Sequence, residues 1–442
     1  MSTADTSPPL KMGAAPAWQW AGLLLFWVAL CFAALPTGLS WNYDVVAESS
    51  DGSWVLRLQW TSVFAFAAWV IYRTAGWAVV YPAAKNPFVW LLLAYCVLSV
   101  LWSPEPGAVI KRSFQFFGVL LIGLSVAHLC RHDFVTLLRT GLDGLTAILF
   151  LSVLAGVLVP DIGRESVVSL AGAWRGILDQ KNTLGIVSAV SLFFWLVLQT
   201  LAPRRGWAAG LTCLIILTCL LMSRSSTSLF LALLSIGLYL LLYRAYIRTP
   251  LAIARLVVVV LMVVTVGLTL FFFQHARLPL WEELIEPFSA LFGKSADLTG
   301  RTEIWEYMWL EIEKHWAFGL GYGSFWLGPG SPSQELVSHF YWTPNSAHNG
   351  YLEVLNELGV LGFGLFALML LNHLVNVIRL VRVNRPKFAF HLSLLVVFLL
   401  SNATESSALR ILLFLQVVLF MSMAMVNQDM LDQDRVPGQK VN

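Results

Sequence analysis

Residues 183–201 read TLGIVSAVSLFFWLVLQTL and contain no charged side chain. An α-helix needs roughly 20 apolar residues to cross the ~30 Å hydrocarbon layer of a bilayer, because lipid offers no partner to backbone polar groups. This stretch therefore predicts a transmembrane helix, and similar apolar runs recur along the chain. Long continuous runs favour a helical bundle over a transmembrane barrel, whose strands read as short alternating segments.

The composition of the whole chain supports this interpretation. Of 442 residues, 58% are hydrophobic and only 12% are charged, a balance that excludes an ordinary soluble domain. We predict an all-α polytopic membrane protein with about twelve transmembrane helices. The spans are expected at residues 17–36, 58–80, 87–102, 112–130, 138–159, 183–201, 206–222, 228–246, 253–273, 354–378, 388–402 and 408–426.

One connection is far longer than the others. Nine spans are expected within residues 1–273, a long loop at 274–353, three spans at 354–426 and a cytoplasmic tail at 427–442. Residues 301–316, RTEIWEYMWLEIEKHW, predict an amphipathic helix, and GLGYGSF at 319–325 predicts a tight turn. Loops of this length usually carry function in a compact protein.

The distribution of Lys and Arg predicts the orientation. Alternate connections hold clusters such as Arg204 and Arg205, or Arg379, Arg382 and Arg385. By the positive-inside rule these connections are cytoplasmic, so the long loop faces the opposite side. In a Gram-negative bacterium this arrangement corresponds to the inner membrane with a periplasmic loop.

Several cations fall on the outer side, where basic residues are normally depleted. They are Arg164, Arg175, Lys181, Arg224 and Arg301. These side chains could contact lipid headgroups or pair with nearby acids. Together they suggest instead an anion-binding site at the outer membrane face, because the planar guanidinium fork matches phosphate oxygens.

A single histidine lies where the long loop meets the next span, in TPNSAHNGYLEVLNELGVLG at 343–362. Pro344, Asn345 and Ser346 are typical of a turn and a helix N-cap, so His348 is expected in the first helical turn. The positive end of the helix dipole disfavours imidazolium there, which favours the neutral form that accepts a proton.

The same stretch also predicts what surrounds this histidine. On a continuous helix, Gly359 and Gly362 would lie below His348, whereas Glu353 and Glu357 would point roughly the other way. The glycines could allow close helix packing, or they could leave a groove for a lipid chain.

Motifs of several other chemistries are absent from the sequence. It contains no P-loop, HExxH, CxxC or GxSxG pattern and no outer pair of aspartates spaced for Mg²⁺. We therefore expect neither a metal site nor a cofactor. Because ATP is not available outside the cytoplasmic membrane, an outer reaction would use an already activated substrate such as a lipid-linked diphosphate sugar.

The glycine spacing after His348–Asn349 resembles the signature of the O-antigen ligases, within the wider family of ligases, polymerases and O-oligosaccharyltransferases. Three further stretches resemble that family: WRGILDQKNTLG at 174–185, SRSSTSL at 223–229, and GRTEIW at 300–305 ahead of GLGYGSF. The resemblance covers residues 180–362 well, and the N-terminal third agrees mainly in hydropathy.

The resemblance implies a metal-independent membrane glycosyltransferase of the GT-C fold type. It would move a glycan from undecaprenyl diphosphate to lipid A–core oligosaccharide, with no nucleic-acid partner. By similarity His348 is the catalytic histidine, Arg224 and Arg301 are essential, and Arg175 and Lys181 belong to the basic loop before the sixth span. Arg164, Asn349 and His339 are possible secondary residues, His339 either as a competing base or as an ordinary loop histidine.

The residues supply a mechanism for this assignment. Neutral His348 would act as general base towards an acceptor hydroxyl, and arginines would stabilise the departing undecaprenyl diphosphate, which gives inversion in a single displacement. A polymerase or a protein O-oligosaccharyltransferase would use the same donor. A flippase or transporter for a polyprenyl-linked glycan is an alternative of another class, although transporters usually place ionisable groups near the membrane midplane.

Overall fold

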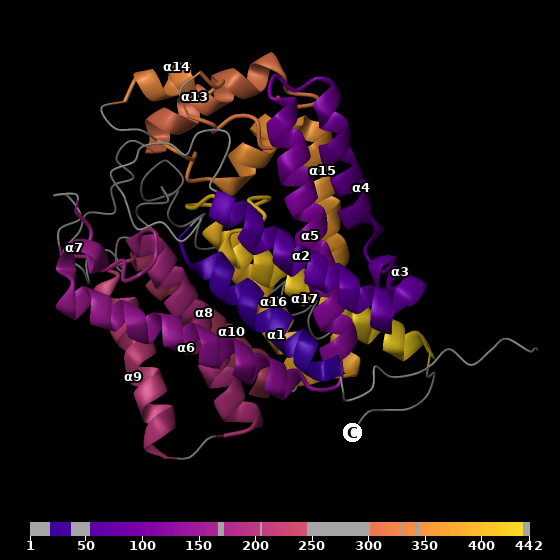
Figure 1. The fold of residues 1–442 in the computed structure, drawn as a ribbon, viewed down its shortest axis with the longest axis vertical. Coiled ribbons are helices and arrows are strands. Elements are labelled where there is room, and N and C mark those ends of the chain that lie inside the picture. Colours follow the sequence, from indigo (N-terminus) through magenta and orange to yellow (C-terminus); the bar gives the residue numbers. More distant parts are fainter. Residues whose placement is uncertain are drawn as a thin grey trace, which may run out of the picture.

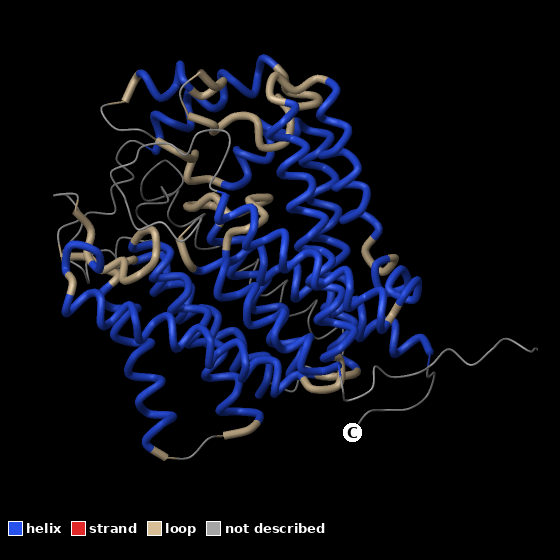
Figure 2. Tube along the Cα trace, viewed as in Figure 1, coloured by secondary structure: helices blue, strands red, loops and turns tan. Residues whose placement is uncertain are grey.

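The structure is a computed structural model that describes residues 18–36, 54–166, 172–203, 206–244, 301–328, 330–340 and 344–435. Figure 1 shows the fold of these residues, and Figure 2 shows that their regular structure is helical throughout. The described residues contain no strand, only an isolated bridge between Arg164 and Trp174.

The longer helices follow the apolar runs of the sequence. Their bounds are α1 (Gln19–Ala34), α2 (Trp54–Thr74), α4 (Pro87–Leu98), α5 (Pro106–Cys130), α6 (Phe134–Leu158), α8 (Lys181–Leu201), α9 (Trp207–Met222), α10 (Ser226–Arg244), α15 (Gly350–Arg379), α16 (Arg385–Ser401) and α17 (Phe414–Arg435). The remaining elements are the amphipathic α13 (Arg301–Lys314) and the short η3 (Gly76–Val79), α3 (Val80–Ala83), η4 (Ser99–Leu101), α7 (Pro160–Gly163), α14 (Gln334–Ser338) and η6 (Leu380–Arg382).

Seven of the described helices are long and apolar enough to cross a membrane. The number rises to eight if the pair Gly76–Ala83 and Pro87–Leu101, bent by 100°, counts as one span. The protein is therefore a polytopic membrane protein, as predicted. The count of twelve is not confirmed, since the predicted span at 253–273 lies outside the described residues and α1, α9 and α16 are shorter than a full span. The GT-C fold type also stays a prediction.

The bundle is held by tight packing in its centre, where α5 lies against α17. The rings of Phe116 and Phe420 stack with centroids 5.1 Å apart, and both side chains are fully buried. A Cβ on Gly123 would come within 3.3 Å of the Phe420 carbonyl oxygen, so a glycine here permits the close approach of the two helices. Around this centre α1 bridges α5 and α6, and α6, α8, α9 and α10 form a second group (Figure 1).

Charged residues pair at one end of the bundle, where α17 finishes. Lys387 contacts Asp429 at 2.7 Å, and Lys85 pairs with Asp434. Helix α17 continues to Arg435, beyond the predicted end of the last span at residue 426. The sequence placed these basic residues on the cytoplasmic side, and the structure brings them together with the acidic end of the last helix.

At the opposite end, α13 and α14 lie across the bundle (Figure 1). Helix α13 is amphipathic, as predicted, and it buries Ile304, Met308 and Ile312. A small core forms where Ile304 and Met308 meet Phe325, Leu336 and Ala347.

Helix α15 is broken at Gly359, whose φ of 62° is left-handed. In an unbroken helix the N–H groups of Val360 and Leu361 would donate to the carbonyls four residues earlier. Here they donate to the carbonyls of Trp316 and Ala317, at 2.8 and 3.2 Å. The carbonyls of Asn356 and Glu357 accept instead from the N–H groups of residues 320 and 321, at 3.0 and 2.8 Å. The main chain of residues 316–321 is thus inserted into the break.

The break corrects the prediction of one continuous helical face below His348. A Cβ on Gly359 would lie 2.4 Å from the Ala317 oxygen, and a Cβ on Gly362 would lie 2.9 Å from the ring of Tyr95. These glycines therefore serve close packing, which was one of the two interpretations considered.

Candidate active site

Helix α15 begins at Gly350, two residues after His348, so the predicted place of this histidine in the first turn is wrong. Asn349 is the N-cap, and its side-chain oxygen accepts hydrogen bonds from the N–H groups of Tyr351 and Leu352. His348 precedes the cap with a φ of 50°, a conformation that is uncommon for a residue with a side chain. Asn349, a possible secondary site residue, has a capping role here.

The loop between α16 and α17 docks against this helix start. The Gly350 N–H lies 2.9 Å from the Asn402 carbonyl and 3.1 Å from that of Glu405, and the Asn349 N–H donates to the Ser406 hydroxyl. A Cβ on Gly350 would lie 2.2 Å from the side-chain oxygen of Asn402. The glycine after the cap therefore permits the contact that brings Glu405 to His348.

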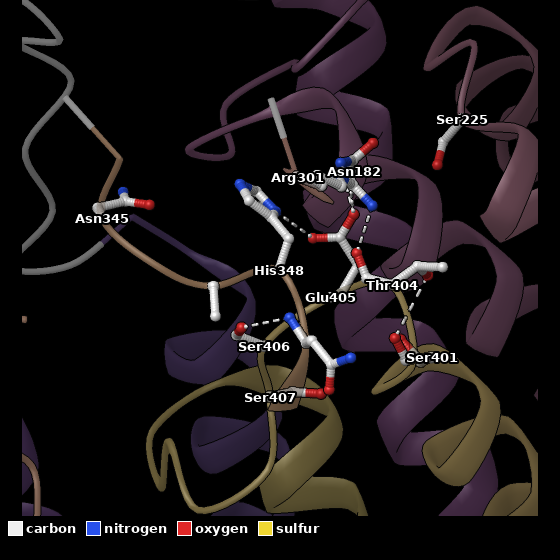
Figure 3. Close-up of polar contacts among 12 residues, drawn as sticks. Asn182, Ser225, Arg301, Asn345, His348, Ser401, Thr404, Glu405, Ser406 and Ser407 are labelled. Atoms are coloured by element: carbon white, nitrogen blue, oxygen red, sulfur yellow. Dashed lines mark hydrogen bonds and ion pairs between the residues drawn. The ribbon is translucent and has the colours of Figure 1, made fainter. Parts of the chain in front are cut away.

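Glu405 is the centre of a cluster drawn from four segments of the chain (Figure 3). Its Oε2 lies 3.4 Å from Nδ1 of His348, and its Oε1 accepts from Nδ2 of Asn182 at 2.8 Å. The Nη2 of Arg301 lies 3.4 Å from Oε1, while its Nη1 donates to the Thr404 carbonyl at 2.6 Å. Two predicted site residues, His348 and Arg301, thus meet at one carboxylate.

The electrostatics of this cluster favour an ionised carboxylate. Burial alone would raise the pKa of Glu405, but the hydrogen bond with His348 and the charges of Arg301 and Lys181 lower it below its usual value. A carboxylate next to Nδ1 holds the proton on that nitrogen, so Nε2 is the ring atom that accepts a proton. This arrangement can therefore deprotonate a hydroxyl group placed next to Nε2 of His348.

The turn that carries His348 is fixed by side chains of its own helix and of its neighbours. Glu353 accepts from the Ala347 N–H at 2.8 Å and pairs with Arg410 at 2.9 Å. Arg410 also donates to the Asn345 carbonyl, and the indole N–H of Trp305 donates to the Ala347 carbonyl at 2.8 Å. Through these contacts Glu353 positions the main chain of the turn directly before His348.

A cavity of about 140 Å³ lies between the helix ends and reaches Glu405. The ends of α1 and α16 and the starts of α2, α8, α10 and α17 enclose it. One part of its lining is polar and includes Asn182, Ser225, Ser228 and Glu405, whereas another part is apolar and includes Trp60. His348 and Arg301 approach the same carboxylate from outside this lining, so the cavity and the histidine share Glu405.

The other predicted cations lie around the loop between α7 and α8. Arg175 is buried, and its guanidinium donates to the carbonyls of Ile162 and Asp161. Arg164 donates to the Gly156 carbonyl and lies over the ring of Trp174. These contacts give both arginines a role in holding the loop, and their contact with a diphosphate stays a prediction.

Arg224 and Lys181 lie closer to the cavity. Arg224 lies between α9 and α10 with a φ of 49°, directly before Ser225, and the predicted boundary between the spans at 206–222 and 228–246 is confirmed. The Arg224 guanidinium packs closely on Gly172, where an added Cβ would lie 3.2 Å from both terminal nitrogens. Lys181 begins α8 next to Asn182, and its charge acts on Glu405.

His339 lies apart from the cluster around Glu405. It is exposed at the end of α14, where its ring packs on Tyr307 with centroids 4.6 Å apart and its Nδ1 lies 2.7 Å from the Glu335 carbonyl. Among the described residues, no group of three or more His, Cys, Asp or Glu side chains is arranged to hold a metal ion.

Glu405 and Asn182 were not identified from the sequence. Glu405 is the single acidic residue in the connection between the last two predicted spans, and this connection is on the same side as the unexplained cations. An acidic residue on the same side as several cations could have pointed to Glu405 as a partner of those cations. Asn182 lies within WRGILDQKNTLG, next to Lys181, and only the structure distinguishes it from its neighbours.

These features define a multi-pass helical membrane protein with a histidine, a carboxylate and an arginine gathered at one end of the bundle. Comparison with known proteins agrees with the sequence motifs. Residues 211–367 match the family described as O-antigen ligase. The exopolysaccharide production protein ExoQ of Rhizobium meliloti (strain 1021) is 25% identical over 293 residues, which cover 65% of this chain and 64% of ExoQ. Both similarities support a place for this chain in the O-antigen ligase superfamily, and the match spans less than two thirds of the length of the curated relative.

Proposed function

We propose that the protein is an O-antigen ligase, a metal-independent inverting glycosyltransferase that moves a glycan from undecaprenyl diphosphate to lipid A–core oligosaccharide. The reaction takes place at the periplasmic face of the bacterial inner membrane. The observation that carries this proposal is the meeting of His348 and Arg301 at Glu405, beside a cavity with both polar and apolar lining.

The cluster assigns a role to each group in the transfer. An acceptor hydroxyl gives its proton to Nε2 of His348 while its oxygen attacks the anomeric carbon of the donor sugar. The bond from that carbon to the diphosphate oxygen breaks, and undecaprenyl diphosphate departs with both bonding electrons. Glu405 holds the Nδ1 proton and stabilises the imidazolium that forms. A single displacement from the opposite face inverts the anomeric centre.

Arginines take the place that a metal ion would have at the leaving group. Arg301 contacts the Thr404 carbonyl and Glu405 through two of the five guanidinium N–H donors, so the other donors can bind a phosphate oxygen. Arg224 adjoins Ser225, which lines the cavity, and it is the second candidate for this contact. Fixed cations contribute most where charge develops during the reaction, which here is the departing diphosphate.

A polymerase is the second candidate function. It would use the same donor but a second lipid-linked glycan as acceptor. The similarity to a protein named for exopolysaccharide production favours this alternative over protein glycosylation.

The test is reconstitution of the purified protein with undecaprenyl-diphosphate-linked glycan and one of three acceptors: lipid A–core, a second lipid-linked glycan, or a Ser/Thr peptide. We expect transfer to lipid A–core, and activity that EDTA does not reduce. Transfer to the second glycan instead would identify a polymerase. Movement of the donor across a vesicle membrane without transfer would identify a transporter.

Two histidine variants test the assignment of the base. His348→Ala should abolish transfer while the protein still inserts and folds, and His339→Ala should keep most of the activity, because His339 packs on Tyr307 away from Glu405. Retained transfer in His348→Ala would remove this residue from catalysis.

A further inference from the structure

A second groove lies between the first turns of α2 and α5, and the proposed reaction does not account for it. Its volume is about 400 Å³, and it is lined by residues 56–64 of α2 and 105–115 of α5. Its polar lining includes Arg57, Lys111, Glu105 and Gln115. The groove is therefore separate from the cluster around Glu405.

The groove closes towards the middle of the membrane. Phe64 and Phe114 pack edge to face with centroids 5.8 Å apart, and both line the groove. One turn further along α5, a Cβ on Gly118 would lie 2.4 Å from the Phe64 ring, so the two helices touch there. The space between α2 and α5 is thus confined to their first turns.

The charges that line the groove favour an anion. Arg57 and Lys111 contribute two cations and Glu105 one carboxylate. The N-terminus of the 25-residue helix α5 adds the positive end of its dipole. Both cations are on the side of the membrane that the sequence assigns to the outside, where the positive-inside rule does not explain them.

The outer surface beside the groove is suited to lipid. Trp54, Leu58 and Ile110 are 73%, 63% and 62% exposed. These side chains come from the same turns of α2 and α5 that line the groove, and they lie in or next to helices that span the membrane. A molecule in the groove could therefore place a charged headgroup between the helices and its acyl chains along this apolar surface.

The groove also adjoins the cavity of the candidate active site. Leu56 and Trp60 line both spaces, and both side chains are buried. A headgroup in the groove is therefore separated from the cavity that reaches Glu405 by one wall of side chains.

We propose that the groove between α2 and α5 binds the phosphorylated headgroup of the acceptor lipid, so that its sugars extend past Leu56 and Trp60 towards His348. This inference rests on the proposed function for the identity of the acceptor. The binding of a phosphorylated lipid to the groove is independent of it.

Gly107 offers a way to test the groove without removing a residue that could support the fold. It is an exposed glycine in the first turn of α5, it lines the groove, and a Cβ there would meet nothing within 4 Å. Gly107→Glu places a negative charge in the groove, and an acidic residue near a helix N-terminus favours the helix. Gly210→Glu is the matched control, since Gly210 is an exposed glycine near the start of α9 with equally open surroundings.

The first measurement is binding of the purified, full-length protein to phosphorylated lipid A in nanodiscs. We expect Gly107→Glu to weaken binding about tenfold or more, because the added carboxylate repels a phosphate and competes for the cations, and we expect Gly210→Glu to leave binding unchanged. Glu105→Gln should strengthen binding, because it removes the carboxylate from the lining. Equal binding by wild type and Gly107→Glu, or equal binding of lipid A and its dephosphorylated form, would overturn the proposal.

The second measurement separates this proposal from the proposed function. In the transfer assay Arg57→Glu should raise the KM for lipid A–core with little change in kcat or in the KM for the donor. Arg73→Glu, at the other end of α2, should change none of these values. If the wild type transfers no glycan but Gly107→Glu still weakens lipid binding, the proposed function fails and the groove remains. If phosphatidylglycerol displaces lipid A equally well, the groove is a general phospholipid site and its role as an acceptor site is refuted.

Discussion

Replacement of Glu405 by glutamine tests the catalytic cluster with a change of a single atom. Oε1 of this carboxylate faces Asn182 and Arg301, whereas Oε2 faces His348. An amide can keep its oxygen towards Asn182 and Arg301 and turn its NH₂ group towards Nδ1 of His348. The NH₂ group donates to Nδ1, so the ring proton moves to Nε2 and that nitrogen can no longer accept a proton.

The expected loss follows from the contribution of the general base. General acid–base catalysis contributes about 10²–10⁴-fold to a rate, so kcat for Glu405→Gln should fall by about that factor. The KM for the donor should stay within about threefold, because Arg301 keeps its main-chain contact with Thr404. Initial rates of glycan transfer by the purified protein, with the thermal unfolding midpoint measured alongside, provide both values.

The matched control is Asp429→Asn, which also neutralises a carboxylate paired with a cation, but at the far end of the bundle. This variant should keep its kcat. If Glu405→Gln retained a kcat within about threefold of the wild type, Glu405 would not set the tautomer of His348 and the assigned mechanism would be wrong.

Three further predictions concern the fold, the leaving group and the pH dependence. Gly359→Ala should destabilise the protein by about 3 kcal/mol or more, because φ is 62° and a Cβ would lie 2.4 Å from the Ala317 oxygen. Gly364→Ala on the same helix should leave the stability unchanged, since a Cβ there meets nothing within 4 Å, and thermal unfolding measures both variants. Arg301→Lys should restore only part of the transfer activity lost in Arg301→Ala, since lysine keeps the charge but not the planar fork, and full activity would exclude a bidentate contact. The pKa of Glu405 lies below its usual 4.5, so its contacts stabilise the protein fully above that pH and are lost as the pH falls through the lowered pKa. The unfolding midpoints of wild type and Glu405→Gln should therefore converge as the pH falls below that lowered pKa.

The sequence predicted most of the features that depend on local pattern. The apolar runs became helices, residues 301–314 formed the amphipathic helix α13, and SRSSTS separated α9 from α10. Each of these features follows from hydrophobic periodicity or from residues that favour a break, and both are readable within a short window.

Features set by distant contacts were not predictable in this way. Several residues before α15 can cap a helix, and Asn349 is the cap because the loop at Ser406 accepts its N–H. The break at Gly359 depends on the main chain of residues 316–321, which no pattern within α15 announces. Glu405 reaches His348 only because the loop between α16 and α17 docks at Gly350, so the pattern around the histidine does not reveal its carboxylate.

The insertion of residues 316–321 into α15 has a consequence for how this protein can vary. Four main-chain groups of α15 have their hydrogen-bond partners in residues 316–321. The outer segment that carries these residues, 301–340, must therefore change or be exchanged together with α15. Because these bonds involve main-chain atoms, side chains elsewhere in the segment can be substituted without disturbing the attachment. Relatives that act on different glycans are therefore expected to differ at exposed positions such as Trp309 and Leu310, while a graft of the outer segment alone should fail to fold.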